Sequence, residues 1–231
     1  MKAARLARIQ RYRHAARHGV AAAIEHNEIP LPADTRTVID VGSHRGQFAV
    51  LALARFPLAR VLCFEPQPGP REVLHAVLKE DKDRVEVFPF AAASQSSPQE
   101  MHISRADDSS SLLPIGKRYV TAFPGTETRA VAPVQAVRVD EVVDVVEQPC
   151  LMKIDVQGYE LQVLQGTEKL LPRVTHVVVE CSFTELYVGQ ALADDVVAYL
   201  HDQNFRLSGI YGLKRDRAGK CLHADFLFEL E

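Results

Sequence analysis

The chain lacks the paired cysteines of a zinc site. Its four cysteines are scattered through 231 residues without a C-x-x-C pair, and this spacing argues against zinc. Cys63, Cys150 and Cys181 lie in or beside apolar, strand-like runs. This pattern predicts buried thiols in a reducing compartment, and therefore a cytoplasmic protein.

A basic surplus and a long apolar run are also missing. Lys and Arg total 27 against 30 Asp and Glu, so the net charge is −3, which argues against a dedicated nucleic-acid binder. No stretch approaches the ~20 apolar residues of a membrane-spanning helix, so we expect no transmembrane segment. Apolar residues make up 47% of the chain, which is ordinary for a globular protein with a substantial core.

The N-terminus is the exception to the charge balance. It lacks the continuous apolar core of a signal peptide, and its apolar residues fall near one helical face. We expect residues 1–30 to form a basic accessory helix packed on the domain. Peripheral contact with anionic lipid, or with an acidic partner, is the alternative. Six basic residues precede the first acid, Glu25: Lys2, Arg5, Arg8, Arg11, Arg13 and Arg17.

Beyond residue 31, apolar strand-like runs alternate with helical segments. Continuous apolar strands separated by helices are typical of a mostly parallel sheet that is covered on both faces. We predict an α/β fold with a doubly wound, mostly parallel seven-stranded sheet and an antiparallel C-terminal strand, in a single domain over residues 31–231. The strand-like runs are residues 37–41, 60–64, 85–88, 151–155, 176–181, 207–212 and 225–230.

This periodicity fails between residues 94 and 133, where the chain is polar and broken by prolines. Irregular connections of this length in compact domains are often lids or substrate loops. We interpret the segment as a lid or substrate loop, with surface disorder as the alternative. Its apolar residues, which favour a covered position, are Leu112, Leu113, Ile115, Tyr119 and Phe123.

The stretch VIDVGSHRGQF, residues 38–48, predicts a ligand-binding turn. Asp40 lies at the end of the first strand, and Gly42 and Gly46 flank a short loop before a helix. Glycine permits a tight turn and close approach of a ligand. A dinucleotide motif needs G-x-G-x-x-G, and this G-x-x-x-G is one glycine short, so a pyrophosphate is not expected. An acid at the strand end favours a cationic or amino-bearing ligand.

Glu65, in the motif FEPQP, follows the second strand and lies 19 residues after Gly46. A carboxylate at this place in a doubly wound fold accepts hydrogen bonds from a ribose diol. A glycine turn and a ribose-binding acid without a pyrophosphate site together indicate S-adenosylmethionine.

These motifs continue along the chain with AAAS, SSSLL, VQAVRVDEV, LMKIDVQGYELQVLQG and VVVECS. Together they resemble the FkbM family of methyltransferases over roughly residues 36–230. The resemblance implies a class I, Rossmann-like methyltransferase fold and S-adenosylmethionine-dependent O-methylation of a hydroxyl on a sugar, glycan or natural product. The residues then expected to bind the cofactor are Asp40, Gly42, Ser43, Gly46, Phe48, Glu65, Pro66, Ala91 and Asp155.

Two positions depart from the usual family motifs. Ser43, His44 and Arg45 stand where Ala-Asn-x is frequent in the glycine loop, and the His44-Arg45 pair changes the contacts available near the cofactor's carboxylate. Gln157 stands where the family often has the acid of D-V-E-G, so a role that needs negative charge at this position is not carried over.

Methyl transfer to a hydroxyl requires an aligned acceptor and removal of its proton. Asp155, at a strand end beside the expected methyl position, is our first choice for binding the cofactor's amine or orienting the acceptor, and Glu180 is the second catalytic candidate. His44 and His223 are alternative bases. Asp155 and Glu180 together suggest Mg²⁺, but no ligand spacing supports a metal.

Two other functions share these features. A nicotinamide-dependent oxidoreductase would share the fold and Glu65 but needs further glycines in register. A non-catalytic relative would keep the cofactor pocket without methylating anything. The predicted partner of the enzyme is a small-molecule or glycan acceptor.

Overall fold

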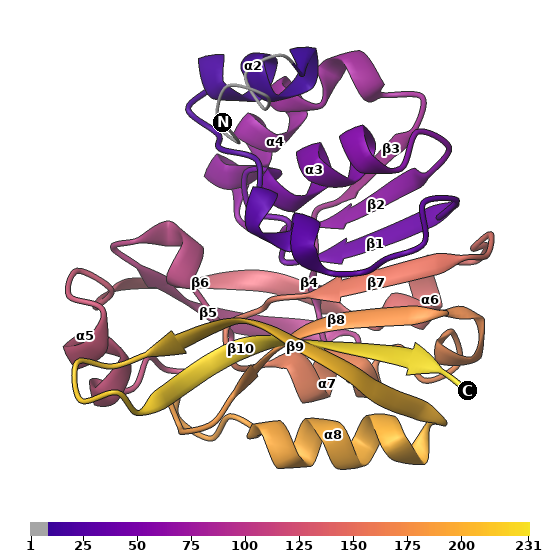
Figure 1. The fold of residues 1–231 in the computed structure, drawn as a ribbon. Coiled ribbons are helices and arrows are strands. Elements are labelled where there is room, and N and C mark those ends of the chain that lie inside the picture. The colour runs from indigo at the N-terminus through magenta and orange to yellow at the C-terminus, as the bar shows by residue number, and fades with distance from the viewer. Residues whose placement is uncertain (1–8) are drawn as a thin grey trace.

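Seven strands form one sheet in the order β3-β2-β1-β7-β8-β10-β9 in the computed structural model, which describes residues 9–231 (Figure 1). Each neighbouring pair is parallel except the two that involve β10, which runs antiparallel to β8 and β9. The predicted sheet and its antiparallel C-terminal strand are confirmed. The strands are β1 (Thr37–Val41), β2 (Arg60–Phe64), β3 (Val85–Phe88), β7 (Cys150–Ile154), β8 (His176–Ser182), β9 (Phe205–Arg215) and β10 (Cys221–Leu230).

Helices cover both faces of this sheet. Successive strand side chains point to opposite faces, so Val38 and Leu151 pack with one set of helices and Ile39 and Met152 with the other. The need to bury both faces explains the continuous apolar runs. The first face carries α2 (Gln10–Arg17), α3 (Gln47–Arg55) and α4 (Pro68–Val77), and the second α6 (Val139–Val142), α7 (Glu160–Gln165) and α8 (Ala193–Asp202).

Helix α2 is the described part of the basic N-terminal segment, and Lys2, Arg5 and Arg8 lie outside the described residues. Arg11 donates hydrogen bonds to both carboxylate oxygens of Asp81 at 2.9 and 2.5 Å, and Ala15 is fully buried, so α2 packs on the domain. It is shorter than predicted, because the chain turns at Gly19 with φ 73° and continues as the 3₁₀ helix η1 (Ile24–Glu28).

The prediction of an irregular segment over residues 94–133 was wrong at both ends. β5 (Ser97–Ser104) and β6 (Thr128–Val137) are antiparallel and form a three-stranded sheet with β4 (Ala91–Ala92). Their burial alternates or is low, so they lack the apolar runs of the main sheet. The part between them holds the 3₁₀ helix η3 (Asp107–Ser109) and α5 (Lys117–Ala122). Two further 3₁₀ helices are η2 (Lys79–Asp81) and η4 (Leu171–Arg173).

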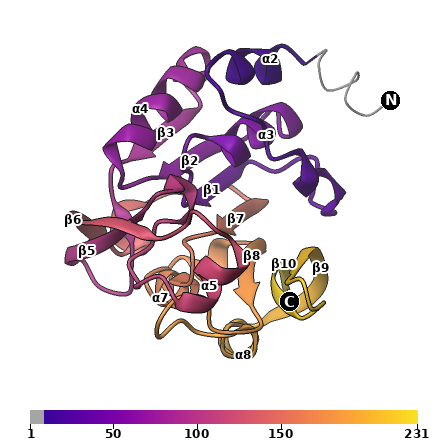
Figure 2. The same ribbon diagram turned by 90° about the vertical axis from the view of Figure 1, so that its left-hand side faces the viewer.

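The carboxyl ends of the parallel strands meet at one edge of the sheet, where α/β folds bind ligands. In Figure 1 the arrowheads of β1 and β2 point toward the side on which α5, β5 and β6 lie, and Figure 2 views the molecule from that side. The segment from β4 to β6 therefore lies next to the ligand-binding edge. Within residues 9–231, no helix is long and apolar enough to cross a membrane.

Gly42 fixes the backbone at this edge. It has φ 82°, and a Cβ here would overlap the backbone carbonyl oxygen of Asp155. We expect Gly42→Ala to lower the free energy of unfolding by about 3–5 kcal/mol, since it combines left-handed strain with a backbone clash. Gly219→Ala is the matched control, because Gly219 has φ 83° with nothing within 4 Å of its added Cβ, and should cost about 1 kcal/mol. If urea denaturation gave the same loss of unfolding free energy for Gly42→Ala and Gly219→Ala, the clash with the Asp155 carbonyl would contribute nothing.

Candidate active site

A cavity opens at the carboxyl edge of β1, β2 and β7, with an empty space of about 540 Å³ that includes open solvent. Apolar side chains line it together with polar groups that include Glu65, Asp155 and Gln157. A largely apolar lining with a few polar groups is typical of small-molecule sites. The apolar lining is Phe64, Pro66, Phe90, Ala91, Ala92, Met101 and Leu112, so the predicted residues Pro66 and Ala91 lie in this wall.

Glu65 is buried in the wall of this cavity, with 3% of its surface exposed. Its Oε1 accepts a hydrogen bond from the backbone N–H of Gln67 at 2.7 Å, and its Oε2 accepts one from that of His44 at 2.9 Å. Burial raises the pKa of Glu65 to about 7, although both N–H groups favour the ionised form. A carboxylate has about four lone-pair sites, so capacity remains for a ligand's hydroxyls.

The glycine turn lies between β1 and α3. The Ser43 hydroxyl donates to the carbonyl oxygen of Asp40 at 2.7 Å, and Gly46 caps α3 with φ 93°. The Asp40 carboxylate is fully buried and has no hydrogen-bond partner among the described residues. Burial raises its pKa against the opposing charge of Lys153. Asp40 and Gly46 line neither the first cavity nor the second. They contribute to the backbone conformation of the turn, through the Asp40 carbonyl oxygen and the left-handed Gly46.

A second, more polar cavity of about 830 Å³ adjoins the first. Phe48 and Tyr119 give it aromatic surface. Gly42, Asp155 and Gln157 line both cavities and so form part of their boundary. Its other polar lining groups are Glu25, His26, Ser43, His44, Gln47, Asp108, Ser109 and Lys153.

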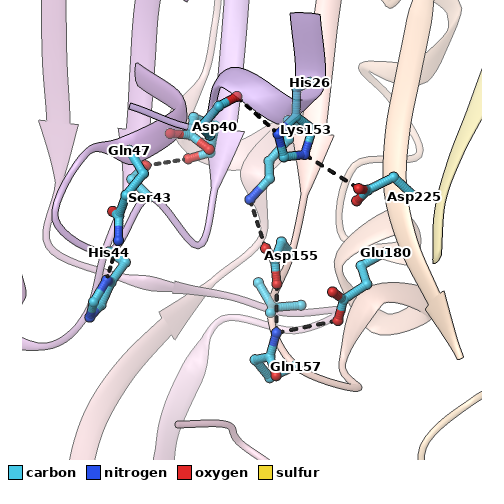
Figure 3. Close-up of polar contacts among 12 residues, drawn as sticks. His26, Asp40, Ser43, His44, Gln47, Lys153, Asp155, Gln157, Glu180 and Asp225 are labelled. Atoms are coloured by element: carbon cyan, nitrogen blue, oxygen red, sulfur yellow. Dashed lines mark hydrogen bonds and ion pairs between the residues drawn. The ribbon is translucent and has the colours of Figure 1, made fainter. Parts of the chain in front are cut away.

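A chain of polar contacts runs along this boundary (Figure 3). Lys153 Nζ lies 3.1 Å from Asp155 Oδ2, and Gln157 Nε2 donates to Asp155 Oδ1 at 2.7 Å. The same amide nitrogen donates to Glu180 Oε2 at 3.3 Å, and Glu180 Oε1 lies 2.8 Å from His223 Nδ1. The two predicted catalytic acids are thus joined through Gln157. Asp155 lines both cavities, whereas Glu180 lines neither.

The surroundings of Asp155 and Glu180 shift the pKa values of the two carboxyl groups in opposite directions. Burial favours the neutral form of Asp155, but the charge of Lys153 and the Gln157 hydrogen bond outweigh it and lower the Asp155 pKa. Burial and the neighbouring Asp155 raise the pKa of Glu180. Unequal pKa values in neighbouring acids are typical of an acid–base site.

The segment between β5 and β6 is tied to the glycine turn through Asp107. One carboxylate oxygen of Asp107 lies 3.1 Å from His44 Nε2, and the other accepts a hydrogen bond from Arg45 Nη2 at 2.6 Å. Gln67 Nε2 donates to its carbonyl oxygen at 3.3 Å. η3 therefore borders both cavities. His44 and Arg45, the unusual pair in the loop, hold this segment in place.

Several residues of the site were not predicted from the sequence. Lys153 could have been recognised, because it is a charged residue inside the apolar run LMKI. Tyr119 and His26 leave no comparable signal, since only the fold brings them to the second cavity. Among residues 9–231, no three His, Cys, Asp or Glu side chains are grouped to hold a metal ion.

The fold is that of class I methyltransferases. A solved structure of the methyltransferase FkbM from Methylobacillus flagellatus KT aligns with a TM-score of 0.58 at 15% identity, covering 92% of this chain and 49% of that one. The family model described as the Methyltransferase FkbM domain matches residues 40–207. The chain therefore belongs to the FkbM methyltransferase family, which confirms the resemblance predicted from its motifs.

Two curated relatives are similar to this chain. The 2-O-methyltransferase NoeI of Sinorhizobium fredii is 27% identical over 165 residues, which cover 66% of each protein. The hexuronic acid methyltransferase AglP of Haloferax volcanii is 27% identical over 177 residues, which cover 72% of this chain and 67% of that protein. The chain thus spans about two thirds of the length of both relatives.

The Asp107 contacts give a prediction about local stability. In Asp107→Ala, the amides of Ser109 and Ser110 should exchange hydrogen about tenfold faster, because partly exposed charged hydrogen bonds restrain local opening only modestly. Asp108→Ala is the control, since Asp108 is exposed and bonds only to its neighbour Ser109. Unchanged exchange in Asp107→Ala, measured by mass spectrometry, would show that these contacts do not hold the segment.

Proposed function

We propose that the protein is an S-adenosylmethionine-dependent O-methyltransferase that acts on a hydroxyl of a sugar or glycan. The observation that carries the proposal is the convergence of Glu65, the glycine turn and Asp155 on one cavity. Membership of the FkbM family and two relatives named as methyltransferases, one of hexuronic acid, support it.

The residues present fit this cofactor. The buried Glu65 carboxylate has lone pairs free for a ribose diol, and the apolar wall at Phe64, Phe90 and Ala91 suits an adenine ring. Gly42 keeps the cavity boundary clear of a side chain. We assign Gly42, Ser43, Glu65, Pro66, Ala91 and Asp155 to cofactor contact, and Asp40 and Gly46 to the shape of the turn. Phe48 contributes from the second cavity.

The bound cofactor supplies a methyl group on a positively charged sulfur. The chain must then align an acceptor oxygen and take its proton. We assign Asp155 to orientation at the boundary of the cavities, where Lys153 keeps it ionised. Asp155 is also the candidate base, because it lines both cavities, whereas Glu180 lines neither. Glu180, the second candidate, lies behind it with His223 Nδ1 at 2.8 Å and would take the proton only after Asp155.

The second cavity suits the acceptor. Sugars present apolar C–H faces and many hydroxyls, and this cavity offers aromatic surface from Phe48 and Tyr119 beside polar groups. We propose that residues 105–127 cover it during the reaction, held by the contacts of Asp107. The net charge of −3 is consistent with a small-molecule or glycan acceptor rather than a nucleic acid.

The family match supports methyl transfer over the nicotinamide-dependent alternative. The direct test incubates the purified protein with S-adenosylmethionine and a panel of sugars and uronic acids, followed by mass spectrometry. An acceptor that gains the mass of one CH₂ group, with matching formation of S-adenosylhomocysteine, supports the proposal. Cofactor binding without turnover on any acceptor would favour a non-catalytic relative.

Glu65 should control cofactor affinity in a pH-dependent way. We expect Glu65→Ala to weaken S-adenosylhomocysteine binding by roughly 1.5–3 kcal/mol at pH 8, the worth of hydrogen bonds to a charged group. Ribose hydroxyls favour the ionised carboxylate, and the Glu65 pKa is about 7. Wild-type affinity should therefore rise about tenfold from pH 6 to pH 8, and the variant should lose this slope.

Isothermal titration calorimetry measures both effects. Glu72→Ala removes an exposed acid from α4 and should match the wild type. Unchanged affinity in Glu65→Ala would defeat the ribose assignment.

Asp155→Asn tests the chemistry. It keeps the size of the side chain and removes its charge, so turnover should fall by a factor on the order of a hundred or more. A catalytic role is favoured over helix capping, because the N-cap of α7 is Tyr159 and the Asp155 carboxylate bonds the side chains of Lys153 and Gln157 instead. The melting temperature should fall, because the buried Lys153 loses the charge of its direct partner, so turnover is measured on folded protein well below that temperature. Asp144→Asn, at an exposed site, is the control; a folded, fully active Asp155→Asn would overturn the assignment.

A further inference from the structure

The side chain of Gln157 uses its whole hydrogen-bonding capacity in the boundary between the cavities. Its amide nitrogen donates to the carboxylates of Asp155 and Glu180, at 2.7 and 3.3 Å. Its carbonyl oxygen accepts from the hydroxyls of Tyr187 at 2.8 Å and Tyr119 at 3.3 Å. A primary amide has two N–H donors and two lone pairs, so four partners match it completely.

The backbone around Gln157 is unusual as well. Gln157 has φ 59°, a left-handed conformation that is unfavourable for a residue with a Cβ. Gly158 follows with φ 99°, and a Cβ on it would lie 3.0 Å from that of Tyr187. The turn after β7 is thus packed against Tyr187 and aims the Gln157 amide between the two acids. Strain of this kind persists where surrounding contacts determine it, often at functional sites.

The side-chain amide of Gln157 is uncharged, but the side chains around it are mostly titratable. Asp155, directly after β7, and Glu180, in β8, both accept hydrogen bonds from the amide, and their side chains are 32% and 19% exposed. The titratable groups that face this region are Asp40, Lys153 and Asp155 from β1 and β7, Glu160 from α7, Glu180 from β8, His223 and Asp225 from β10, His26 from η1, Tyr119 from α5, and Tyr187.

We propose that Gln157 is a positioning residue for the methyl transfer, whose neutral amide fixes the two carboxylates relative to each other and lets both remain ionised. This inference rests on the proposed function for the reaction it serves. An ionised acid at this position would accept the two tyrosine hydroxyls but donate nothing to Asp155 or Glu180. Three carboxylates would then meet, and neighbouring like charges prevent full ionisation, so the cluster would take up a proton.

Two variants distinguish the loss of the amide's hydrogen-bond donors from a change in side-chain size. Gln157→Glu keeps the size and the acceptor for the tyrosines, whereas Gln157→Met keeps approximate size and removes all hydrogen bonds. The tyrosine hydroxyls keep a partner in the Met variant, because the Ser109 carbonyl oxygen lies 3.0 Å from the Tyr187 hydroxyl as its alternative acceptor, and the Ser109 hydroxyl lies 3.1 Å from that of Tyr119. Gln95→Glu adds the same charge at an exposed bend and is the control.

The first readout is melting temperature against pH, which needs neither cofactor nor acceptor. A carboxyl whose folded pKa is raised makes the folded state bind more protons, so its stability contribution is lost as pH rises. Gln157→Glu should therefore lose on the order of 5 °C more, relative to wild type, at pH 8 than at pH 5.5. The Gln95→Glu difference from wild type should not widen in this way, and that of Gln157→Met, which loses the donors without adding a charge, should widen less than that of Gln157→Glu. A Gln157→Glu difference that is flat with pH overturns the proposal.

The second readout is kinetic. Both Gln157 variants should lower kcat by about tenfold or more, and the fall in kcat should exceed any loss of S-adenosylhomocysteine affinity, because Glu65 is untouched although Gln157 lines the same cavity. The acid limb of the kcat profile in Gln157→Glu should move to higher pH by about one unit. Wild-type kcat and an unmoved profile in the Glu variant would overturn the positioning role.

The two proposals fail in different ways. If the wild type neither binds S-adenosylhomocysteine nor methylates any acceptor, the proposed function fails, while the melting curves still decide whether Gln157 keeps the acids ionised. If the wild type is active but the Gln157→Glu melting difference does not depend on pH, only the inference about Gln157 fails.

Discussion

The buried charge of Lys153 is the interaction on which the site depends. The residue is 5% exposed in the middle of the sheet, and a buried cation is tolerated only with compensating negative charge. Asp155 supplies it directly at 3.1 Å, and the unpartnered Asp40 carboxylate adds to it from β1. The lysine in turn holds Asp155 ionised, and through Gln157 the arrangement extends to Glu180. One core charge therefore orders the acids at the boundary of both cavities.

The glycine turn couples this core to the ligand-binding edge. Gly42 lets β1 leave the sheet in contact with the backbone of Asp155, so the turn and the acids have one fixed geometry. His44 connects them further: its N–H binds Glu65, and its side chain contacts Asp107 of the segment above. His44 thereby connects Glu65 in the lining of the first cavity to η3, which borders both cavities.

The main sheet, the glycine turn and Glu65 were predictable because they depend on local periodicity and on spacing along the chain. The contact of Glu180 with His223 was not, since it depends on the antiparallel register of β8 and β10, which a sequence does not display. β6 was missed, and only residues 100–104 of β5 carry a recognisable strand signal, because exposed faces and prolines hide the rest of the pattern. Gln157 was visible as a departure from a motif, but its four partners come from β7, β8, α5 and the segment after β8.

The strand β4 has a consequence for how such a protein diversifies. β4 is only two residues long, yet it lies parallel to the end of β6 and carries Ala91 and Ala92 of the first cavity's apolar lining. The chain leaves the main sheet beside β4 and returns to it beside β4, so β5, residues 105–127 and β6 form one continuous excursion. Asp107 ties this excursion to the glycine turn, and the backbone of Gly116 ties it to Leu186. Substitutions in the excursion that spare these contacts can change the lining of the second cavity while the register of β4 against β6 stays the same.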